Sequence, residues 1–164
     1  MYKVGDRVVY SSLGVFEITD ERPEQVFGAT AVYYELKAID EPAASLIFVP
    51  KGSPIEKSAM RPLISKERAL EIISRASELA PAEWIKENRA RANFAKSIID
   101  GGDHEKIISL IKAIDKVQKE RIDEGKKPFL QDSHLRERAV KLILSELSLV
   151  LGLDEAELRE KILI

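Results

Sequence analysis

The spacing of apolar residues changes its period once along this chain, near residue 63, and this change limits the possible folds. From Tyr2 to Pro62 the apolar residues form short, β-branched runs bounded by glycine, proline and serine. From Ser65 onward they recur at helical spacing. We therefore expect an α+β chain with two domains, a small sheet domain at 1–62 and an all-α domain at 65–164.

The first region is expected to contain four short strands, which cover residues 7–10, 15–19, 31–39 and 46–49. Segments that contain Pro23, Gly28 and Pro42 separate them as turns or loops. Because no helical period intervenes to build a parallel sheet, this pattern favours a small open barrel of the SH3-like or Tudor-like class. The stretch 49–54 is expected to end the sheet, and 60–64 to lead across to the helices.

The second region is expected to form a bundle of about five helices. Residues with N-cap or first-turn character mark the starts, namely Ser65, Pro81, Asp103, Asp132 or Ser133, and Asp154. Glycines mark two of the ends, at Gly101-Gly102 and at Gly152, and the last helix is expected to reach Ile164. Apolar stripes along these segments supply the residues of one packed core.

Composition and motifs argue against several classes of protein. The chain has no cysteine, which excludes disulfides and thiolate metal sites. It has no phosphate-binding loop, nucleophile elbow or HExxH motif, so we predict neither an enzyme nor a cofactor. Asp100, Asp103, His104 and Glu105 suit a helix end followed by an N-cap better than a metal site. No apolar run approaches 18 residues and no signal peptide is evident, so we expect a cytoplasmic protein without a membrane span.

The only tryptophan, Trp84, opens a basic stretch at 81–96 that is predicted to be helical. One face of this helix would hold Lys86, Arg89, Asn93 and Lys96, which fall within roughly 80° of one another. Two hypotheses stay open for Trp84: it packs in a core or interface, or it projects and stacks on a base or wedges between base steps. Because the net charge is −2, any DNA contact is expected to be a local patch.

Several short sequences, taken in order, resemble the CarD family of bacterial transcription regulators. They are YKVGDRVVYSSLGV near the N-terminus, Tyr33-Tyr34, the strand end IFVP at 47–50, Trp84, Gly102-Asp103 and the helix around Glu146-Leu147. None is specific alone, whereas their order and spacing cover nearly the whole chain. The first domain also resembles the polymerase-interacting module of transcription-repair coupling factors, but their ATPase motor has no counterpart here.

The resemblance implies a function and a set of contact residues. The barrel would bind a lobe of the RNA polymerase β subunit through Val26, Tyr33, Tyr34, Ile47 and Phe48. The helical domain would touch promoter DNA at the upstream edge of the transcription bubble, where Trp84 would wedge into the minor groove and oppose closure. The residues expected to hold the DNA backbone are Lys86, Arg89, Arg91, Lys96, Lys126, Lys127 and Arg138. The protein would then be nucleoid-associated through RNA polymerase.

Two features depart from the family pattern. Well-known members have a basic residue directly before the Val-Pro that ends the fourth strand, whereas this chain has Phe48. The spacing between Trp84 and Arg91 is about two residues longer than in those members. A second functional hypothesis stays open, in which the protein is an interaction adapter, both domains bind proteins, and Trp84 lies in an interface without touching DNA.

Overall fold

The computed structural model describes residues 1–41 and 43–163. Residue contacts divide the chain into two compact units, Met1–Leu63 and a second that begins at Ile64. Pro42, expected in a loop, and Ile164, expected to end the last helix, lie outside the described residues. Each unit is described by itself below.

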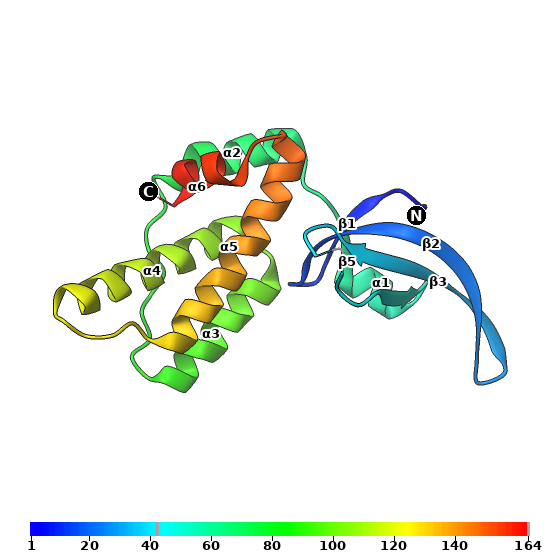
Figure 1. The fold of residues 1–164 in the computed structure, drawn as a ribbon, viewed down its shortest axis with the longest axis horizontal. Helices are drawn as coiled ribbons and strands as arrows, with labels where there is room; N and C mark the ends of the chain where they lie inside the picture. The colour runs from blue at the N-terminus through cyan, green and yellow to red at the C-terminus, as the bar shows by residue number, and fades with distance from the viewer. Residues whose placement is uncertain (42, 164) are drawn as a thin grey trace. The chain divides into compact units, whose positions relative to one another are not determined.

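The N-terminal unit contains an open antiparallel sheet, which has five strands within the described residues and the order β4-β3-β2-β1-β5 (Figure 1). The strands are β1 (Arg7–Tyr10), β2 (Gly14–Val26), β3 (Ala29–Ala38), β4 (Ile47–Pro50) and β5 (Met60–Pro62). The bounds of β1 are those predicted from the sequence. An α+β chain was also predicted, and the combination of this sheet with the helices confirms it.

The hairpin of β2 and β3 is longer than predicted, because β2 continues through Pro23 to Val26. Pro23 was expected to interrupt the sheet. It is tolerated because β1 pairs only with residues 14–17 of β2, so the outer part of β2 is an edge and needs no donor there. On its other side Pro23 lies opposite Val32 in the β2–β3 ladder.

Two short elements that the sequence did not predict follow β4, and the second lies in the stretch 60–64 that was expected only to lead across to the helices. Helix α1 (Pro54–Ala59) begins after Ser53, whose hydroxyl accepts a hydrogen bond from the backbone N–H of Glu56 at 3.2 Å. Strand β5 follows at once and pairs antiparallel with β1. The sheet therefore does not end at 49–54 as predicted, because β5 returns to it after a capped surface helix.

The strand register assigns the predicted polymerase-contacting residues to two different faces of the sheet. Tyr34 lies opposite Val49 and Ile47 lies opposite Leu36, and residues directly opposite share a face. Tyr34 is fully buried, its hydroxyl donates to the backbone oxygen of Tyr2 at 3.2 Å, and Ile47 packs against the same core. The prediction that Tyr34 lies at a contact surface is therefore wrong.

The second, outward face of the sheet holds the remaining three predicted contact residues. Tyr33 and Phe48 lie one residue away from Tyr34 and Val49, so they point to the opposite side. Ala29 and Tyr33 are four residues apart on β3, so their side chains point to the same side of the sheet. Val26 lies opposite Ala29 and therefore points to that side as well. Phe48 is 46% exposed and Val26 is 39% exposed.

The second unit contains five of the six helices found in the described residues; the sixth is α1. They are α2 (Lys66–Ala76), α3 (Asn88–Gly101), α4 (His104–Asp123), α5 (Leu130–Leu151) and α6 (Glu155–Ile162). The side chains of Ser65, Asp103 and Asp154 cap α2, α4 and α6 as predicted. Gly102 and Gly152 adopt the left-handed conformation that ends α3 and α5, also as predicted.

Two helix starts differ from the prediction. Helix α3 begins at Asn88 rather than Pro81, and α5 begins at Leu130 rather than Asp132 or Ser133. In the described part of the chain, no helix combines the length and the apolar character that a membrane crossing requires.

Substitution of the two adjacent tyrosines tests the assignment of faces. We expect Tyr34→Ala to lower the free energy of unfolding by about 3 kcal/mol, because a fully buried ring is replaced by a cavity. Tyr33→Ala is expected to cost about 1 kcal/mol or less, because that ring is half-exposed. Urea denaturation of the two variants measures the difference, and equal losses would contradict the register.

Candidate nucleic-acid interface

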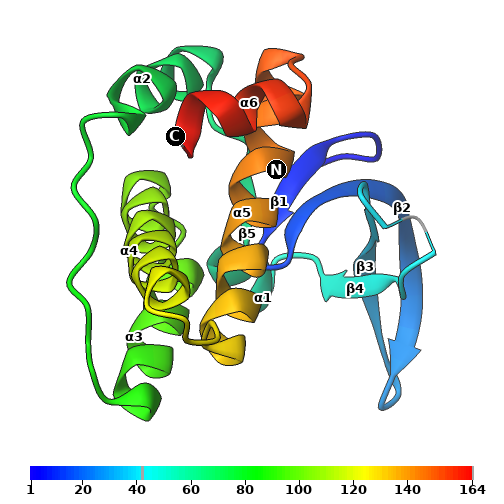
Figure 2. The ribbon, with the colours of Figure 1, turned by 60° about the vertical axis from the view of Figure 1, so that its left-hand side comes forward.

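Trp84 lies on an extended segment rather than on a helix. The segment joins α2 to α3 and runs along the outside of α4, as Figure 2 shows. It is attached there by a hydrogen bond from the backbone N–H of Ala82 to the carbonyl of Ser109, 2.9 Å long. The predicted cationic helix face is therefore incomplete, because Lys86 belongs to this segment and not to α3.

Glu87 explains why the helix starts late. Its carboxylate accepts hydrogen bonds from the backbone N–H groups of Arg89, at 3.0 Å, and Ala90, which makes it the N-cap of α3. These two hydrogen bonds lower the pKa of Glu87 from its ordinary value. This acidic side chain within the basic stretch is thus occupied by the first turn of the helix.

Arg91 is buried and fixes the segment that carries Trp84. Its guanidinium forms an ion pair with Asp132 of α5, with hydrogen bonds of 2.8 to 3.2 Å, and the two side chains are only 6% and 3% exposed. It also donates to the carbonyls of Ile85 and Lys86, each at 3.0 Å. The prediction that Arg91 holds a DNA phosphate is therefore wrong, since its donors are already engaged inside the helical unit.

Two aromatic rings pack on this buried guanidinium. Its central carbon lies 4.4 Å from the centre of the Trp84 ring and 4.9 Å from that of Phe129. The rings themselves are stacked, with centres 6.5 Å apart and planes inclined by 26°. Arg121 lies over Phe129 at 3.8 Å. Trp84 is half-buried in this cluster, so part of its ring packs against the core and part is exposed.

Three of the predicted cations lie in the same unit as the cluster, Lys86 on the segment that carries Trp84 and two on α3. Lys86, Arg89 and Lys96 are exposed and make no ion pair with any residue that the structure describes. Arg89 and Lys96 are seven residues apart on α3 and lie about 20° apart around its axis. Cationic side chains held on one helix face can contact successive phosphates of a nucleic-acid backbone.

The second predicted basic spot is connected to the same cluster. Lys126 and Lys127 are exposed in the loop between α4 and α5, and Arg121 donates to the carbonyl of Lys127 at 2.9 Å. Lys126 forms an exposed ion pair with Glu124 at 2.7 Å, so its ammonium group is less available to contact a phosphate. The last predicted cation, Arg138, lies on α5 and not in this loop. It forms an ion pair with Asp100 of α3 at 3.2 Å.

A shallow hollow of about 410 Å³ lies beside Trp84, between the extended segment and α4. Ala113 and Val117 supply apolar lining, and Lys116 and Glu120 also line it. The sequence patterns did not point to Lys116, Phe129 or Arg121, and they indicated Asp132 only as a possible start of the fourth helix. The one signal in the sequence that could have indicated the cluster was Asp132, an acidic residue within the apolar pattern of α5.

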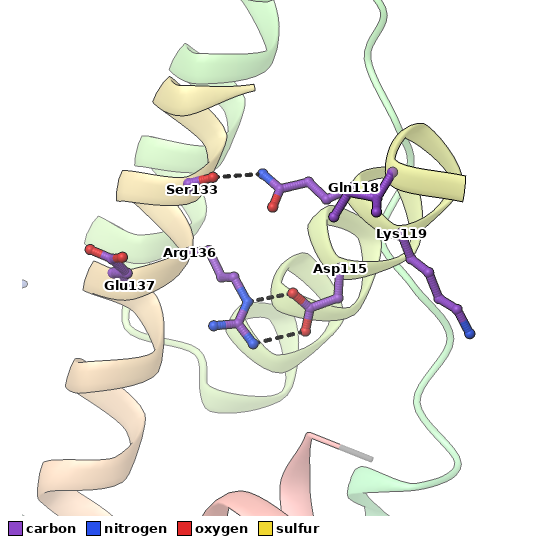
Figure 3. A pocket seen from close by; sticks show the side chains of 7 residues that line it. Asp115, Gln118, Lys119, Ser133, Arg136 and Glu137 are labelled. Atoms are coloured by element: carbon purple, nitrogen blue, oxygen red, sulfur yellow. Dashed lines mark hydrogen bonds and ion pairs between the residues drawn. The ribbon is translucent and has the colours of Figure 1, made fainter. Parts of the chain in front are cut away.

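A second hollow between α4 and α5, of about 440 Å³, has its main charges already paired (Figure 3). Arg136 makes a two-point contact with the carboxylate of Asp115, and the amide of Gln118 donates to the hydroxyl of Ser133 at 3.0 Å. Both interactions join the two helices. We therefore assign this hollow a structural role.

The acidic cluster near the start of α4 is divided among separate partners. Asp103 caps the helix, and Glu105 contacts Arg75 at 3.1 Å. His104 lies 2.7 Å from the buried Glu146, between its Nε2 and a carboxylate oxygen. Among residues 1–41 and 43–163, no group of three or more histidine or acidic side chains is arranged to hold a metal ion.

The outward face of the sheet is a candidate protein-binding surface in the other unit. Arg22 lies over the Phe48 ring at 5.4 Å and forms an ion pair with Glu35. The backbone N–H of Lys51 donates to Val32 at 2.8 Å, so the alternation of an antiparallel ladder directs the N–H of Phe48 to the open edge of β4.

Comparison with known proteins adds no assignment to these two surfaces. No protein-family model matches the chain, and no curated protein is significantly similar to it. The functional argument therefore depends on the geometry of the Trp84 cluster and of the sheet face.

Removing the partner of Arg91 is expected to release Trp84. We expect Asp132→Ala to lower the free energy of unfolding by about 3 kcal/mol, because a buried charge loses its counter-ion. The emission of Trp84, the only tryptophan, should shift to longer wavelength as its ring becomes more hydrated.

Asp115→Ala is the matched control, because it breaks a more exposed ion pair between α4 and α5. It should cost about 1 kcal/mol or less and leave the emission unchanged. Denaturation followed by fluorescence measures both effects, and an unshifted spectrum for Asp132→Ala would show that the ion pair does not position Trp84.

Proposed function

We propose that this protein is a transcription regulator similar to the CarD family, in which the sheet unit binds the RNA polymerase β subunit and the helical unit stabilises the open promoter. In this proposal the protein is not an enzyme, needs no cofactor, and is cytoplasmic and nucleoid-associated through RNA polymerase. Trp84 is the wedge at the upstream edge of the transcription bubble.

The observation that carries the proposal is the rigid support of a partly exposed indole in a unit that also exposes unpaired cations. The Arg91–Asp132 ion pair and Phe129 hold the inner part of the ring. Lys86 is exposed on the same segment as Trp84, Arg89 and Lys96 are exposed on α3, and none of the three forms an ion pair with a described residue. A ring that is already ordered loses little conformational entropy when it inserts between base steps.

The polymerase part of the proposal is supported by the sheet. The strand order β5-β1-β2-β3-β4, with antiparallel neighbours throughout, suits the SH3-like or Tudor-like barrel that we propose for this unit. The open edge of β4 offers backbone groups for strand addition, and Val26, Tyr33 and Phe48 offer side chains. Phe48 in place of a basic residue makes this proposed contact more apolar.

The proposed mechanism needs only weak binding to DNA. A protein anchored on polymerase presents Trp84 to the DNA at high effective concentration. A preference of about 1.4 kcal/mol for the open over the closed promoter shifts that equilibrium tenfold. Insertion is easiest at the fork, where base pairs are already separating and unstacking costs less.

The adapter hypothesis remains the second candidate because Trp84 is half-buried. A ring packed on Phe129 and Arg91 also suits the edge of a protein–protein interface. In that case the surrounding cations would contribute to solubility and would not meet phosphates.

Open-promoter lifetime tests the role of Trp84. With purified RNA polymerase, we expect the wild-type protein to lengthen the lifetime and Trp84→Ala to lose most of that effect. A pull-down with the β subunit must first show that both forms bind equally. If both forms lengthen the lifetime alike, Trp84 is structural and the adapter hypothesis takes its place.

The salt dependence of DNA binding tests the role of the cations. For a forked promoter fragment, Lys96→Ala should reduce the slope of log K against log salt by about 0.9, which corresponds to one lost phosphate contact. Lys161→Ala removes an exposed charge from α6 and should leave the slope unchanged. Fluorescence anisotropy at several salt concentrations measures the slopes, and equal slopes for all forms would exclude Lys96 as a phosphate contact.

A further inference from the structure

The outer end of the β2–β3 hairpin is an uncharged and exposed projection. We call residues 23–32 the β2–β3 finger. Every residue from Gln25 to Val32 is uncharged, although a third of the chain is charged. Among the described residues, β1 pairs with β2 only as far as residue 17 and β4 pairs with β3 only from residue 33, with one further hydrogen bond from the N–H of Lys51 to the carbonyl of Val32, so the finger beyond Val32 has two strands. Two exposed strands without a third layer are marginally stable alone.

The tip of the finger carries a phenylalanine in an unfavourable backbone conformation. Phe27 and Gly28 form the two-residue turn, with φ values of 51° and 79°. Positive φ at both positions defines a type I′ turn, in which asparagine or glycine is preferred at the first position. Phe27 is also fully exposed at 105%. The residue therefore adds strain and exposes a large ring without packing on its own unit.

The chemistry of the finger favours one class of partner. It has no cation to meet a nucleic-acid phosphate or a lipid phosphate, since Glu24 is its only charge and the neighbouring Arg22 pairs with Glu35. Val26 shares the outward face of the sheet with Tyr33 and Phe48, so the finger continues the proposed polymerase surface. An apolar crevice on a protein is the environment that an uncharged projection with an aromatic tip fits.

We propose that the β2–β3 finger inserts Phe27 into an apolar crevice of the RNA polymerase β subunit, as a second contact beyond the edge of β4. This inference rests on the proposed function, because it names a further contact with the same partner. Burial of one phenylalanine ring on binding accounts for a tenfold or larger gain in affinity.

The substitution Phe27→Asn separates binding from stability. Asparagine suits the backbone conformation better than phenylalanine, so the melting temperature should rise by about 1 to 2 °C. The Kd for purified core RNA polymerase should nevertheless increase about tenfold or more. Ser11→Asn is the matched control, because Ser11 is exposed in a different turn and has a φ of 50°. It should raise the melting temperature similarly and leave the Kd unchanged.

Four results would overturn the inference. If Phe27→Asn binds polymerase like the wild type, the finger makes no contact, while the proposed function stands. If the melting temperature falls, Phe27 packs within its own unit. If sedimentation shows a wild-type dimer that Phe27→Asn abolishes, a second copy of the chain occupies the tip. Failure of the wild type to bind polymerase would overturn the proposed function itself, together with this inference.

Discussion

The buried ion pair between Arg91 and Asp132 determines the shape of the candidate interface. Burying two charges is costly, and the cost is tolerable only where every donor finds an acceptor. Here the guanidinium is surrounded by the carboxylate of Asp132, two backbone carbonyls and the side-chain oxygen of Asn88. Such a pair contributes little net stability, but it admits few alternative arrangements of the segment that it holds. The irregular backbone around Trp84 is thereby given one conformation.

Arginine and lysine have different tasks around this ion pair. Arg91 and Arg121 face inward, where their flat guanidinium groups lie on Trp84 and Phe129 and donate to backbone carbonyls. Lys86, Lys96 and Lys127 remain exposed. This division follows from chemistry, because guanidinium is weakly hydrated and stacks on rings, whereas ammonium is compact and strongly hydrated. Exposure alone therefore does not identify the basic residues that hold Trp84 and Phe129 in place.

The sequence predicted the elements whose signals are local and failed where tertiary contacts decide. Caps such as Asp103 and Gly102 and the apolar stripes of the helices are local signals, and they were predicted correctly. Strand β5 has only three residues and exists through its pairing with β1, which no local pattern shows. The helical spacing of 81–87 was misleading, because Glu87 caps α3 and Arg91 binds the carbonyls that a longer helix would have used. The alternation of side chains along β3 could have shown that Tyr33 and Tyr34 point to opposite faces of the sheet.

The sequence resembles the CarD family, but its spacing between Trp84 and Arg91 is about two residues longer than in well-known members. The extended backbone before α3 bears on this difference. Had the tryptophan been part of the helix, two extra residues would have rotated it by about 200° and carried it to the far side. In an extended segment that is held at Ala82 and at the Arg91 guanidinium, extra residues lengthen the path between two anchors and leave both anchors in register. The segment can therefore gain or lose residues during evolution while the indole keeps its place.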